Sequence, residues 1–492
     1  MILVDNLTET ILETAKDLTR PMDYPRLLEE IINDAMRITN SDGGTLYIMI
    51  NNALYFMIMI TKSKDFRRGG DGKPVDLPPV ELDSTSVCAY VARTKTTKNI
   101  ADVYHDKEFN WDGPKKYDKL NDYHTCSELV VPLINHEQKV IGVLQLINAH
   151  DGDGNIVAYT EQEEQICEAI GSLAAVSLSN SNMIKQLQEL LDSIALSFTD
   201  AIETRTPFNA NHTRHVAQYC WDFAEFLNKR AQEEGKTNPT LDENSCDQLY
   251  MAASLHDIGK MSVSRSLLNK ADRLGPYMDR MKERWRFILT DLRVKKYAGT
   301  VTDDEYVRTA RRYNEYIDFI MKINTAGYLD DETLEKVEKI AAERYWTFDG
   351  EEIMFVSEPE AEDLRVRKGT LTTDERKAIE KHAVYTSKIL EKITFGDKYN
   401  RVRFIAGAHH EYLDGSGYPE GLTADKLPIE VRILTIMDIF DSLTADDRPY
   451  KKAHDKDGAL RILSAMVTEG KLDPELVELA KEFFETEPIL DR

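Results

Sequence analysis

Two clusters of histidine and aspartate, far apart along the chain, have the composition of a metal centre. The first is the pair His256-Asp257, and the second is the run His409-His410-Glu411. Imidazole and carboxylate are ligands that suit iron, manganese, zinc and nickel. Burying such pairs is unfavourable unless a compensating charge is present, and metal ions supply that charge. The pattern therefore predicts a metal site rather than isolated polar residues.

Adjacency of His256 and Asp257 sets a geometric condition on that site. Neighbours on a helix point about 100° apart, so both side chains reach one ion only if the ion lies beside the helix. A bimetallic site meets the condition, because one carboxylate can bridge two ions. Further candidate ligands are His212, His382 and Asp438. His215 lacks a matching partner, and we interpret it as an ordinary polar or core histidine.

A glycine-rich loop follows the second cluster, with the sequence Asp414-Gly415-Ser416-Gly417-Tyr418-Pro419. Its two glycines allow a tight loop at positive φ near the metals, and the proline stiffens it. Tyr418 has two interpretations that the residues leave open. It either stacks on a guanine or meets a protein partner, or it is a buried tyrosine that follows a turn.

These motifs together resemble the HD-GYP family of cyclic di-GMP phosphodiesterases. The resemblance runs from about residue 204 to 484, with one interruption, and includes residues 371–375 and 438–444. It implies an all-α HD-superfamily domain at 204–492. The implied metal ligands are His212, His256, Asp257, His382, His409, His410 and Asp438, with Asp257 as the bridge. The implied catalytic residues are Asp257 and Lys260, and the implied substrate contacts are Lys260, Gly417, Tyr418, Arg448 and Lys451.

The resemblance also implies a number of metals. Some family members place a glutamate four residues before the first histidine, where it helps to hold a third ion. This chain has Phe208 at that position, so we expect two divalent ions. The mixed nitrogen and oxygen ligands favour iron or manganese.

The implied reaction is hydrolysis of cyclic di-GMP to linear pGpG and onward to GMP. Two divalent ions would activate water as the nucleophile and bind the non-bridging phosphodiester oxygens. Lys260 would neutralise the phosphate or assist the leaving group, while Arg448 and Lys451 would contact the second phosphate. The alternatives are hydrolysis of another cyclic dinucleotide, such as cyclic GMP-AMP, and a non-catalytic cyclic-dinucleotide receptor. The complete ligand set argues against the receptor.

The first part of the chain, residues 1–160, has the pattern of an α+β sensor domain. Apolar segments 44–50 and 53–60 flank Asn51-Asn52, a pair that tolerates positive φ, and predict a hairpin. Segments 129–134 and 140–148 predict a second strand pair, and 7–38 predicts a helix.

Residues 5–178 resemble a GAF domain, especially the GAF modules of cyclic-nucleotide phosphodiesterases. The resemblance rests on Asn99–Tyr104, Phe109-Asn110 and Val140–Asn148. Those modules usually continue with lysine, where this chain has Ala149. The resemblance implies a small ligand, a cyclic nucleotide or another molecule, or dimerisation alone, because a fold does not identify its ligand.

Residues 161–203 predict a long linker helix. Its stripe follows alternating steps of four and three, as in the seam of a left-handed coiled coil. The stripe consists of Ile166, Ile170, Leu173, Ser177, Asn180, Ile184, Leu187, Leu191, Ile194, Phe198 and Ala201. A helix packed on its own domain would show the same stripe over two or three turns, and that alternative fits the first part. The full length favours a parallel homodimer through this helix.

Everything after about residue 204 is expected to be helical, without alternating strands. Residues 275–368 interrupt the HD-like region and carry no cluster of ligand-type residues. They are charged and aromatic and hold helical periodicity in Val307, Ala310, Tyr313, Ile317 and Ile320. We interpret them as a solvated helical excursion, with a functional lid as the alternative.

Composition limits the remaining possibilities. A length of 492 residues predicts two or three domains, and a net charge of −24 argues against binding to nucleic acid polymers or anionic membranes. Five scattered cysteines fit buried thiols in a reducing compartment. The N-terminus shows no secretory signal, and the longest apolar stretch, 53–60, is too short to span a bilayer. We therefore expect a cytoplasmic protein.

Overall fold

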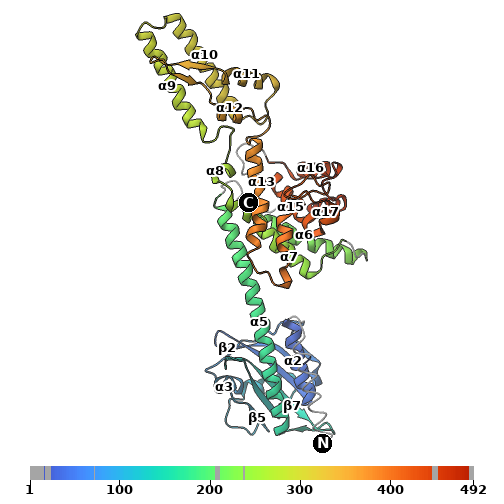
Figure 1. The fold of residues 1–492 in the computed structure, drawn as a ribbon. Helices are drawn as coiled ribbons and strands as arrows, with labels where there is room; N and C mark the ends of the chain where they lie inside the picture. The colour runs from blue at the N-terminus through green and yellow to red at the C-terminus, as the bar shows by residue number, and fades with distance from the viewer. Residues whose placement is uncertain are drawn as a thin grey trace. The chain divides into compact units, whose positions relative to one another are not determined.

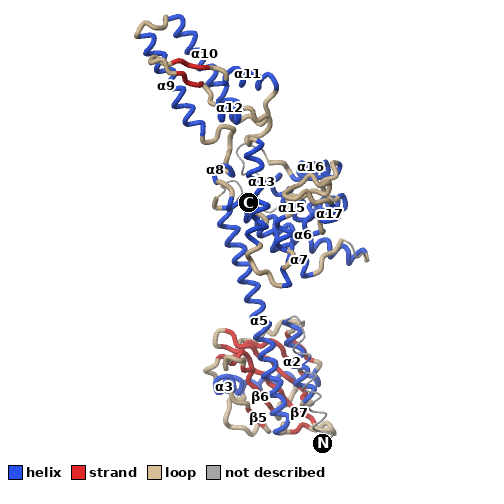
Figure 2. Tube along the Cα trace, in the orientation of Figure 1, coloured by secondary structure: helices blue, strands red, loops and turns tan. Residues whose placement is uncertain are grey.

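The computed structural model describes residues 16, 24–70, 72–205, 211–235, 239–445 and 453–486. The chain divides into two compact units, with the boundary between residues 190 and 191 (Figure 1). Among the described helices, none combines the length and the apolar character that crossing a membrane requires. Figure 2 shows strands in the first unit and in one short hairpin of the second.

The first unit is built on one antiparallel sheet with the strand order β3-β2-β1-β7-β6-β5. Short strands β4 and β8 pair with β2 and β7. The strands are β1 Ser41–Ile50, β2 Ala53–Thr61, β3 Phe66–Gly69, β4 Val80–Glu81, β5 Lys98–Ile100, β6 Glu128–Ile134, β7 Val140–His150 and β8 Ile156–Val157. The helices are α2 Tyr24–Ile38, α3 Val87–Thr94, α4 Asp112–Asn121 and the first part of α5 Glu161–Glu203.

Both predicted strand pairs are confirmed. The β1–β2 turn places Asn51 and Asn52 at φ 48° and 67°, as a two-residue hairpin turn of this hand requires. Strands β6 and β7 pair antiparallel, with a bulge between Leu133 and Ile134. The helix predicted over 7–38 is confirmed from residue 24, while residues 1–15 and 17–23 lie outside the described part of the chain.

Side chains alternate across the sheet and so face two separate cores. On one face, Leu46, Leu144 and Leu146 pack against buried residues of α2 and α5. On the opposite face, Tyr47 and Val143 pack against α3. Figure 1 shows α2 and α5 lying across the sheet. Two long helices, α2 and α5, therefore cover one face of the sheet, whereas the shorter helix α3 packs on the other face.

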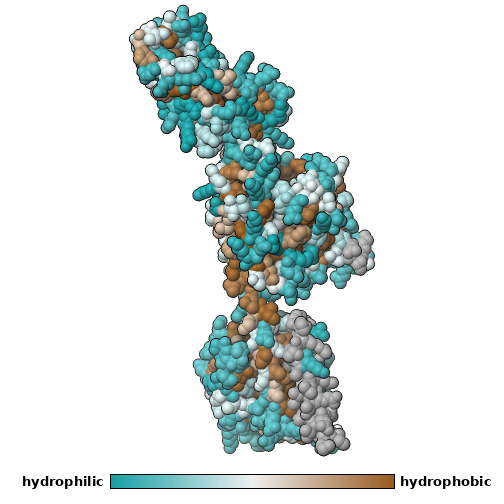
Figure 3. Space-filling view, viewed as in Figure 1, coloured by the Kyte–Doolittle hydropathy of each residue, from teal (hydrophilic) through white to brown (hydrophobic). Residues whose placement is uncertain are grey.

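Helix α5 contributes to both units and has an exposed apolar stretch between its buried ends. Its first turns bury Cys167, Ala174 and Leu178 in the first unit, as the own-domain alternative expects. Its last turns bury Ala195 and Ile202 in the core of the second unit. Between these ends the helix exposes apolar side chains, including Ile184 at 58%, Leu187 at 54% and Ile194 at 42%. Figure 3 shows hydrophobic residues gathered along this stretch.

The second unit is helical outside its insertion, as predicted. Its elements are α6 His212–Glu234, α7 Glu243–Leu255, the 3₁₀ helix η2 Ile258–Ser262, α8 Arg265–Leu268, α13 Thr373–Leu390, η3 Asp397–Tyr399, α14 Val402–Gly407, η4 Ala424–Lys426, α15 Ile429–Thr444, α16 Lys456–Thr468 and α17 Pro474–Thr486. Fully buried Phe223, Leu249, Ile405 and Leu434 from α6, α7, α14 and α15 share one core. These four helices carry or adjoin most of the predicted ligands.

The insertion is mostly helical, as predicted, but its elements share a core, so it is a small folded body and not a solvated excursion. It contains α9 Tyr277–Tyr297, α10 Asp303–Asn324, α11 Asp331–Ala341, α12 Glu358–Leu364 and the hairpin β9 Arg344–Trp346 with β10 Glu352–Met354. The hairpin also contradicts the expectation of no strands. The rings of Trp285 and Phe355 stack at 5.7 Å, beside buried Tyr313. Its aromatic residues thus form a core of their own.

A buried ion pair holds the two ends of the insertion together. Lys270 Nζ donates to Asp363 Oδ1 at 3.0 Å and to Glu375 Oε1 at 2.7 Å. Lys270 precedes the inserted helices, and Glu375 lies in the first turn of α13, after them. The Lys270 side chain is only 3% exposed, which makes this pair harder to screen than one on the surface.

Candidate metal centre

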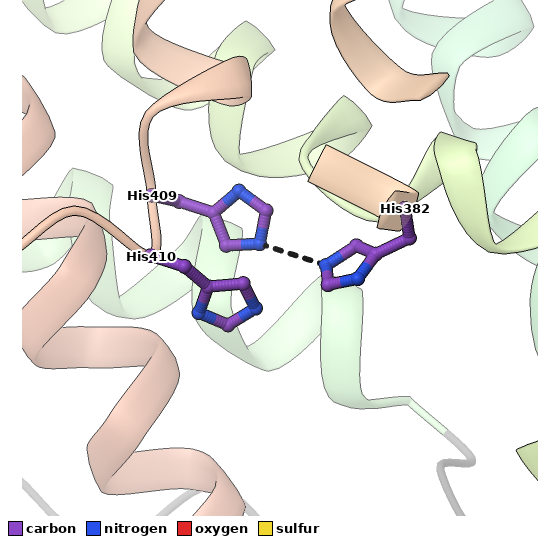
Figure 4. A group of neighbouring side chains, drawn as sticks. All are labelled: His382, His409 and His410. Atoms are coloured by element: carbon purple, nitrogen blue, oxygen red, sulfur yellow. Dashed lines mark hydrogen bonds between the residues drawn. The ribbon is translucent and has the colours of Figure 1, made fainter. Parts of the chain in front are cut away.

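Helical elements that are distant in sequence bring the predicted ligands together. His212 begins α6, His256 and Asp257 follow α7, and His382 lies in α13. His409 and His410 follow α14, and Asp438 lies in α15. Two groups result, each with its ligand atoms within 4.8 Å of one another: His212, His256 and Asp257 in one, and His382, His409 and His410 in the other. Figure 4 shows the three imidazoles of the second group facing one another.

Two carboxylates connect these groups. Asp257 Oδ2 lies 3.3 Å from His256 Nε2, while its Oδ1 lies 3.6 Å from His382 Nε2. Asp438 Oδ1 lies 3.2 Å from His212 Nε2, and its Oδ2 lies 3.8 Å from His410 Nδ1. Each carboxylate therefore presents one oxygen to each histidine group. A ligand that bridges two ions needs this arrangement.

Backbone carbonyls orient three of the imidazoles. The Nδ1 atoms of His256, His382 and His409 lie 2.7, 2.8 and 2.7 Å from the carbonyl oxygens of Ala253, Ile379 and Ala406. Each carbonyl belongs to the residue three positions earlier, so the local helical turn supplies the acceptor. With Nδ1 donating, each neutral ring directs the lone pair of Nε2 into the site, as metal-binding histidines do.

The resulting arrangement fits cations. His382 Nε2 and His409 Nε2 lie 3.4 Å apart (Figure 4), although both rings already use Nδ1–H as the donor. Burial lowers the pKa of His382 and lowers that of His409 well below its ordinary value, so neither ring readily carries a second proton. His256 Nε2 is buried without a hydrogen-bond partner among the described residues. Cations held by the two groups would satisfy these lone pairs, one ion beside His256 and the other beside His382 and His409.

The charges of the site favour the same conclusion. Burial opposes ionisation of Asp257, but Lys260, His256 and His382 hold the pKa of that carboxyl well below its usual range. Burial likewise opposes a charged His212, yet hydrogen bonds with Asp438 and Asp441 raise its pKa to about 10. The carboxylates are thus ionised, and a positive charge beside them is stabilised.

The glycine-rich loop lies against this centre. The backbone N–H of Tyr418 donates to His410 O at 3.1 Å, and the two rings lie 4.7 Å apart at 40°. Gly415 has φ 79°, as predicted. The prediction of positive φ at Gly417 is wrong: this glycine is required for space, because an added Cβ would lie 2.5 Å from Glu411 Cα and from His410 O.

The structure also gives the positions of Lys260 and His215, two other residues that the sequence analysis considered. Lys260 Nζ donates to Asp257 Oδ2 at 2.5 Å, and its side chain is 18% exposed. His215 lies outside both ligand groups, 3.4 Å from Asp441 Oδ1, which is compatible with an ordinary buried histidine. Phe208, Arg448 and Lys451 lie outside the described residues.

The sequence pattern did not predict three residues that hold the candidate ligands in position through hydrogen bonds. Asp441 Oδ2 accepts a hydrogen bond from His212 Nδ1 at 2.6 Å. Thr386 Oγ1 donates to His256 O at 2.7 Å and accepts from Gly259 N at 3.0 Å. Thr435 Oγ1 donates to His409 O at 2.8 Å. Asp441 had a usable signal, because it lies one helical turn after Asp438 on the same face. The threonines had none.

Replacing Asp441 with asparagine should weaken metal binding by about 10- to 100-fold, because partners that orient a ligand histidine contribute that much to affinity. Asparagine keeps the shape but loses the charge that supports the His212 imidazole. Competition with a chromophoric chelator measures the change. Asp457→Asn, at an exposed position of α16, is the matched control and should bind metal normally. Equal affinity in the two variants would contradict a supporting role for Asp441.

Comparison with known protein families assigns a domain type to each half of the chain. Residues 23–178 match the family model of the GAF domain, and residues 359–476 match that of the HD domain. The predicted order, a GAF domain before an HD-superfamily domain, is confirmed. The HD match includes His382, His409, His410 and Asp438, whereas His212, His256 and Asp257 lie before it.

Three curated relatives share parts of the chain. "3'3'-cGAMP-specific phosphodiesterase 3" of Vibrio cholerae is 41% identical over 109 residues, which are 22% of this chain and 23% of the relative. "Cyclic di-GMP phosphodiesterase response regulator RpfG" of Xanthomonas campestris is 36% identical over 24% of this chain and 30% of the relative. "Dual 3',5'-cyclic-AMP and -GMP phosphodiesterase 11A" of Takifugu rubripes is 26% identical over 36% of this chain and 19% of the relative. The chain thus spans less than a third of the length of these relatives.

Proposed function

We propose that this chain is a metal-dependent phosphodiesterase that hydrolyses cyclic di-GMP to pGpG and then to GMP. The observation that carries the proposal is the convergence of His212, His256, Asp257, His382, His409, His410 and Asp438 into two ligand groups connected by two carboxylates. The bacterial relatives add support, because their names describe phosphodiesterases of cyclic dinucleotides.

The proposed cofactor is a pair of divalent ions, iron or manganese, held by these seven residues. Five imidazoles and two carboxylates suit such metals. When bound, two divalent ions would polarise the phosphodiester oxygens and make a water molecule more acidic. Asp257 would bridge them, because its two oxygens face different histidine groups.

The remaining residues of the site would act on the phosphate and the base. Lys260, held against Asp257, is placed to donate to a phosphate oxygen or to the ribose oxygen that leaves. Tyr418, ring to ring with His410, offers an aromatic surface to a guanine. Arg448 and Lys451 remain predicted contacts to the second phosphate. Such local cations are needed because the chain carries a net charge of −24.

A second candidate substrate is 3'3'-cyclic GMP-AMP. A specific observation favours it, since the Vibrio cholerae relative named for that substrate is 41% identical over its matched segment. Both substrates present the same phosphodiester to the site. A non-catalytic receptor for cyclic dinucleotides is the remaining alternative, and the full set of donor atoms in the site is the argument against it.

A turnover assay on the full chain tests the proposal. Protein loaded with manganese, or purified anaerobically with iron, would be incubated with each dinucleotide, and products separated by chromatography. We expect pGpG to appear first and GMP later, with elemental analysis giving two metals per chain. Removing metal with a chelator should stop turnover, and adding it back should restore it. Binding without turnover under every metal condition would instead support the receptor.

We also propose that the chain forms a parallel homodimer through α5. The support is the exposed apolar stretch of that helix, which continues the four-three spacing of a coiled-coil seam. In such a dimer, a ligand of the GAF domain would alter helix packing and so bias the catalytic domains.

Replacing Leu187 and Ile194 together with lysine should convert the dimer to monomers, because two pairs of like charges would then face each other across the seam. Light scattering reads the change as a halved mass. The matched control places the same lysines at Gln186 and Ser193, which are exposed positions one step off the seam. An unchanged mass in the Leu187 and Ile194 variant would contradict the proposed interface.

A further inference from the structure

The less covered face of the GAF sheet contains a cavity of about 480 Å³. Its walls are side chains of β1, β2, β6 and β7, together with the segments around residues 77–88 and 110–114. Aromatic walls come from Tyr47, Phe56 and Trp111. The volume is that of a pocket for a small organic molecule.

One carboxyl group of this wall is completely buried, and only one of its two oxygens has a hydrogen-bond partner among the described residues. Glu128 is 0% exposed, and its Oε1 accepts a hydrogen bond from Gln145 Nε2 at 2.8 Å. Its other oxygen, Oε2, has no hydrogen-bond partner among the described residues. A buried polar atom without a partner is unfavourable, so a ligand that supplies a donor to Oε2 would be bound more tightly than one that does not.

A short hydrogen-bond chain holds Glu128 in the cavity wall. Tyr47 Oη donates to Gln145 Oε1 at 2.8 Å, which leaves the amide nitrogen of Gln145 to donate to Glu128. In this orientation the amide oxygen faces Tyr47 and the amide nitrogen faces Glu128. Burial raises the pKa of Glu128 to about 7, and a donor or a cation at Oε2 would favour the ionised carboxylate.

The rest of the wall provides no counter-charge for an anion. Among the residues that the structure describes there, none is Lys, Arg or His, and the polar ones besides Glu128 are neutral hydroxyl, thiol and amide groups. Ser86 caps the N-terminus of α3, where its hydroxyl accepts from Ala89 N at 3.2 Å. A phosphate or carboxylate would therefore lie near Glu128 without a Lys, Arg or His side chain to compensate its charge.

The aromatic walls favour a cation instead. Tyr47 and Phe56 pack with ring centroids 4.7 Å apart, so both rings are held in place. Aromatic faces attract ammonium groups, and they also stack on flat apolar rings. Glu128 and these rings line the same cavity, and a carboxylate beside aromatic rings is the usual combination of an amine-binding pocket.

We infer that this cavity binds a small, largely apolar molecule that carries an N–H or ammonium donor and no negative charge, with Glu128 as the acceptor. The ligand chemistry is thus opposite to that of an anionic cyclic nucleotide. This inference concerns the sensor half of the chain and does not depend on the proposed phosphodiesterase activity.

A probe series that varies only in charge tests the inference. Tryptamine, indole and indole-3-acetate share one ring system and are cationic, neutral and anionic. Calorimetric titration of the full chain near neutral pH should give binding of tryptamine and indole. Indole-3-acetate should bind more weakly than tryptamine by about tenfold or more, because a charged hydrogen bond of this kind is lost.

Variants locate the effect. Glu128→Gln should weaken the binding of tryptamine by about tenfold or more. Glu137→Gln, at an exposed position of the β6–β7 turn, should leave the affinity for tryptamine unchanged. Leu77 lines the cavity and is 47% exposed, so Leu77→Arg adds a cation without touching the core. This variant should bind tryptamine more weakly, while its midpoint of thermal unfolding stays unchanged.

Three outcomes would overturn the inference. The first is failure of both tryptamine and indole to bind at millimolar concentration. The second is tighter binding of indole-3-acetate, or displacement of tryptamine by cyclic GMP. The third is full tryptamine affinity in Glu128→Gln and Leu77→Arg. Because binding is measured directly, an absence of phosphodiesterase turnover would leave each result unaffected.

Discussion

Replacing Asp257 with asparagine should reduce phosphodiesterase turnover by about 1,000-fold or more and remove bound metal, while the fold is retained. Loss of the bridging charge would cost several kcal/mol of transition-state stabilisation, and each 1.4 kcal/mol is about tenfold in rate. Asparagine has nearly the same shape and can still accept the hydrogen bond from Lys260. Elemental analysis and initial rates, measured on the same preparation, test the two effects together.

The control for Asp257→Asn is Asp425→Asn, which makes the same chemical change at an exposed position of η4 in the same unit. It should keep both metal and turnover. Retained turnover in Asp257→Asn would remove this residue from the bridge. Loss of metal with a lowered midpoint of thermal unfolding in metal-free protein would show a folding defect instead, and circular dichroism separates these cases.

Replacing Gly259 with alanine should destabilise the second unit by about 3 kcal/mol or more and lower turnover by about 100-fold. An added Cβ would overlap the carbonyl oxygen of His382 and lie 2.5 Å from Thr386 N. Both are backbone atoms of α13, so η2 and α13 must move apart. His256 and Asp257, directly before η2, would move with it, and small displacements at a catalytic site have large effects on rate.

Gly396→Ala is the control for this substitution. Gly396 lies in the same unit, has φ −58°, and has no neighbouring atom within 4 Å of an added Cβ. Alanine should be tolerated there or be slightly stabilising, because it restricts the unfolded chain. Chemical denaturation measures the free energy of unfolding of both variants. Equal stability would show that η2 and α13 accommodate the methyl group without rearrangement.

Much of the candidate metal centre was predictable because adjacent residues in the sequence carry its ligand-type side chains. A His-Asp pair and a His-His pair are uncommon in a buried segment, and the structure brings both pairs to one site. The supporting threonines were not predictable. Thr386 and Thr435 act on backbone carbonyls of other elements, and such contacts depend on how helices approach each other in three dimensions.

The fold shows the same division between local and tertiary causes. The Asn51-Asn52 turn follows from residues that tolerate positive φ, so the hairpin was predictable. The insertion was not, because charged helices with scattered aromatic residues fit either a solvated arm or a folded body. Only the packing of residues such as Trp285 and Phe355 from different elements distinguishes the two. Gly417 is likewise required because the backbone of His410 and Glu411 passes close to it, and its local sequence does not show this contact.

The Lys270 ion pair determines how the insertion affects the rest of the HD unit. With Lys270 bonded to Glu375, the chain enters and leaves the insertion at nearly one point. The entropy of closing a loop rises only with the logarithm of its length, so the residues between add little to that term. Elements before and after the insertion therefore remain in register as though joined by a short turn. Insertions or deletions in this segment can therefore leave the geometry of the candidate metal centre unchanged.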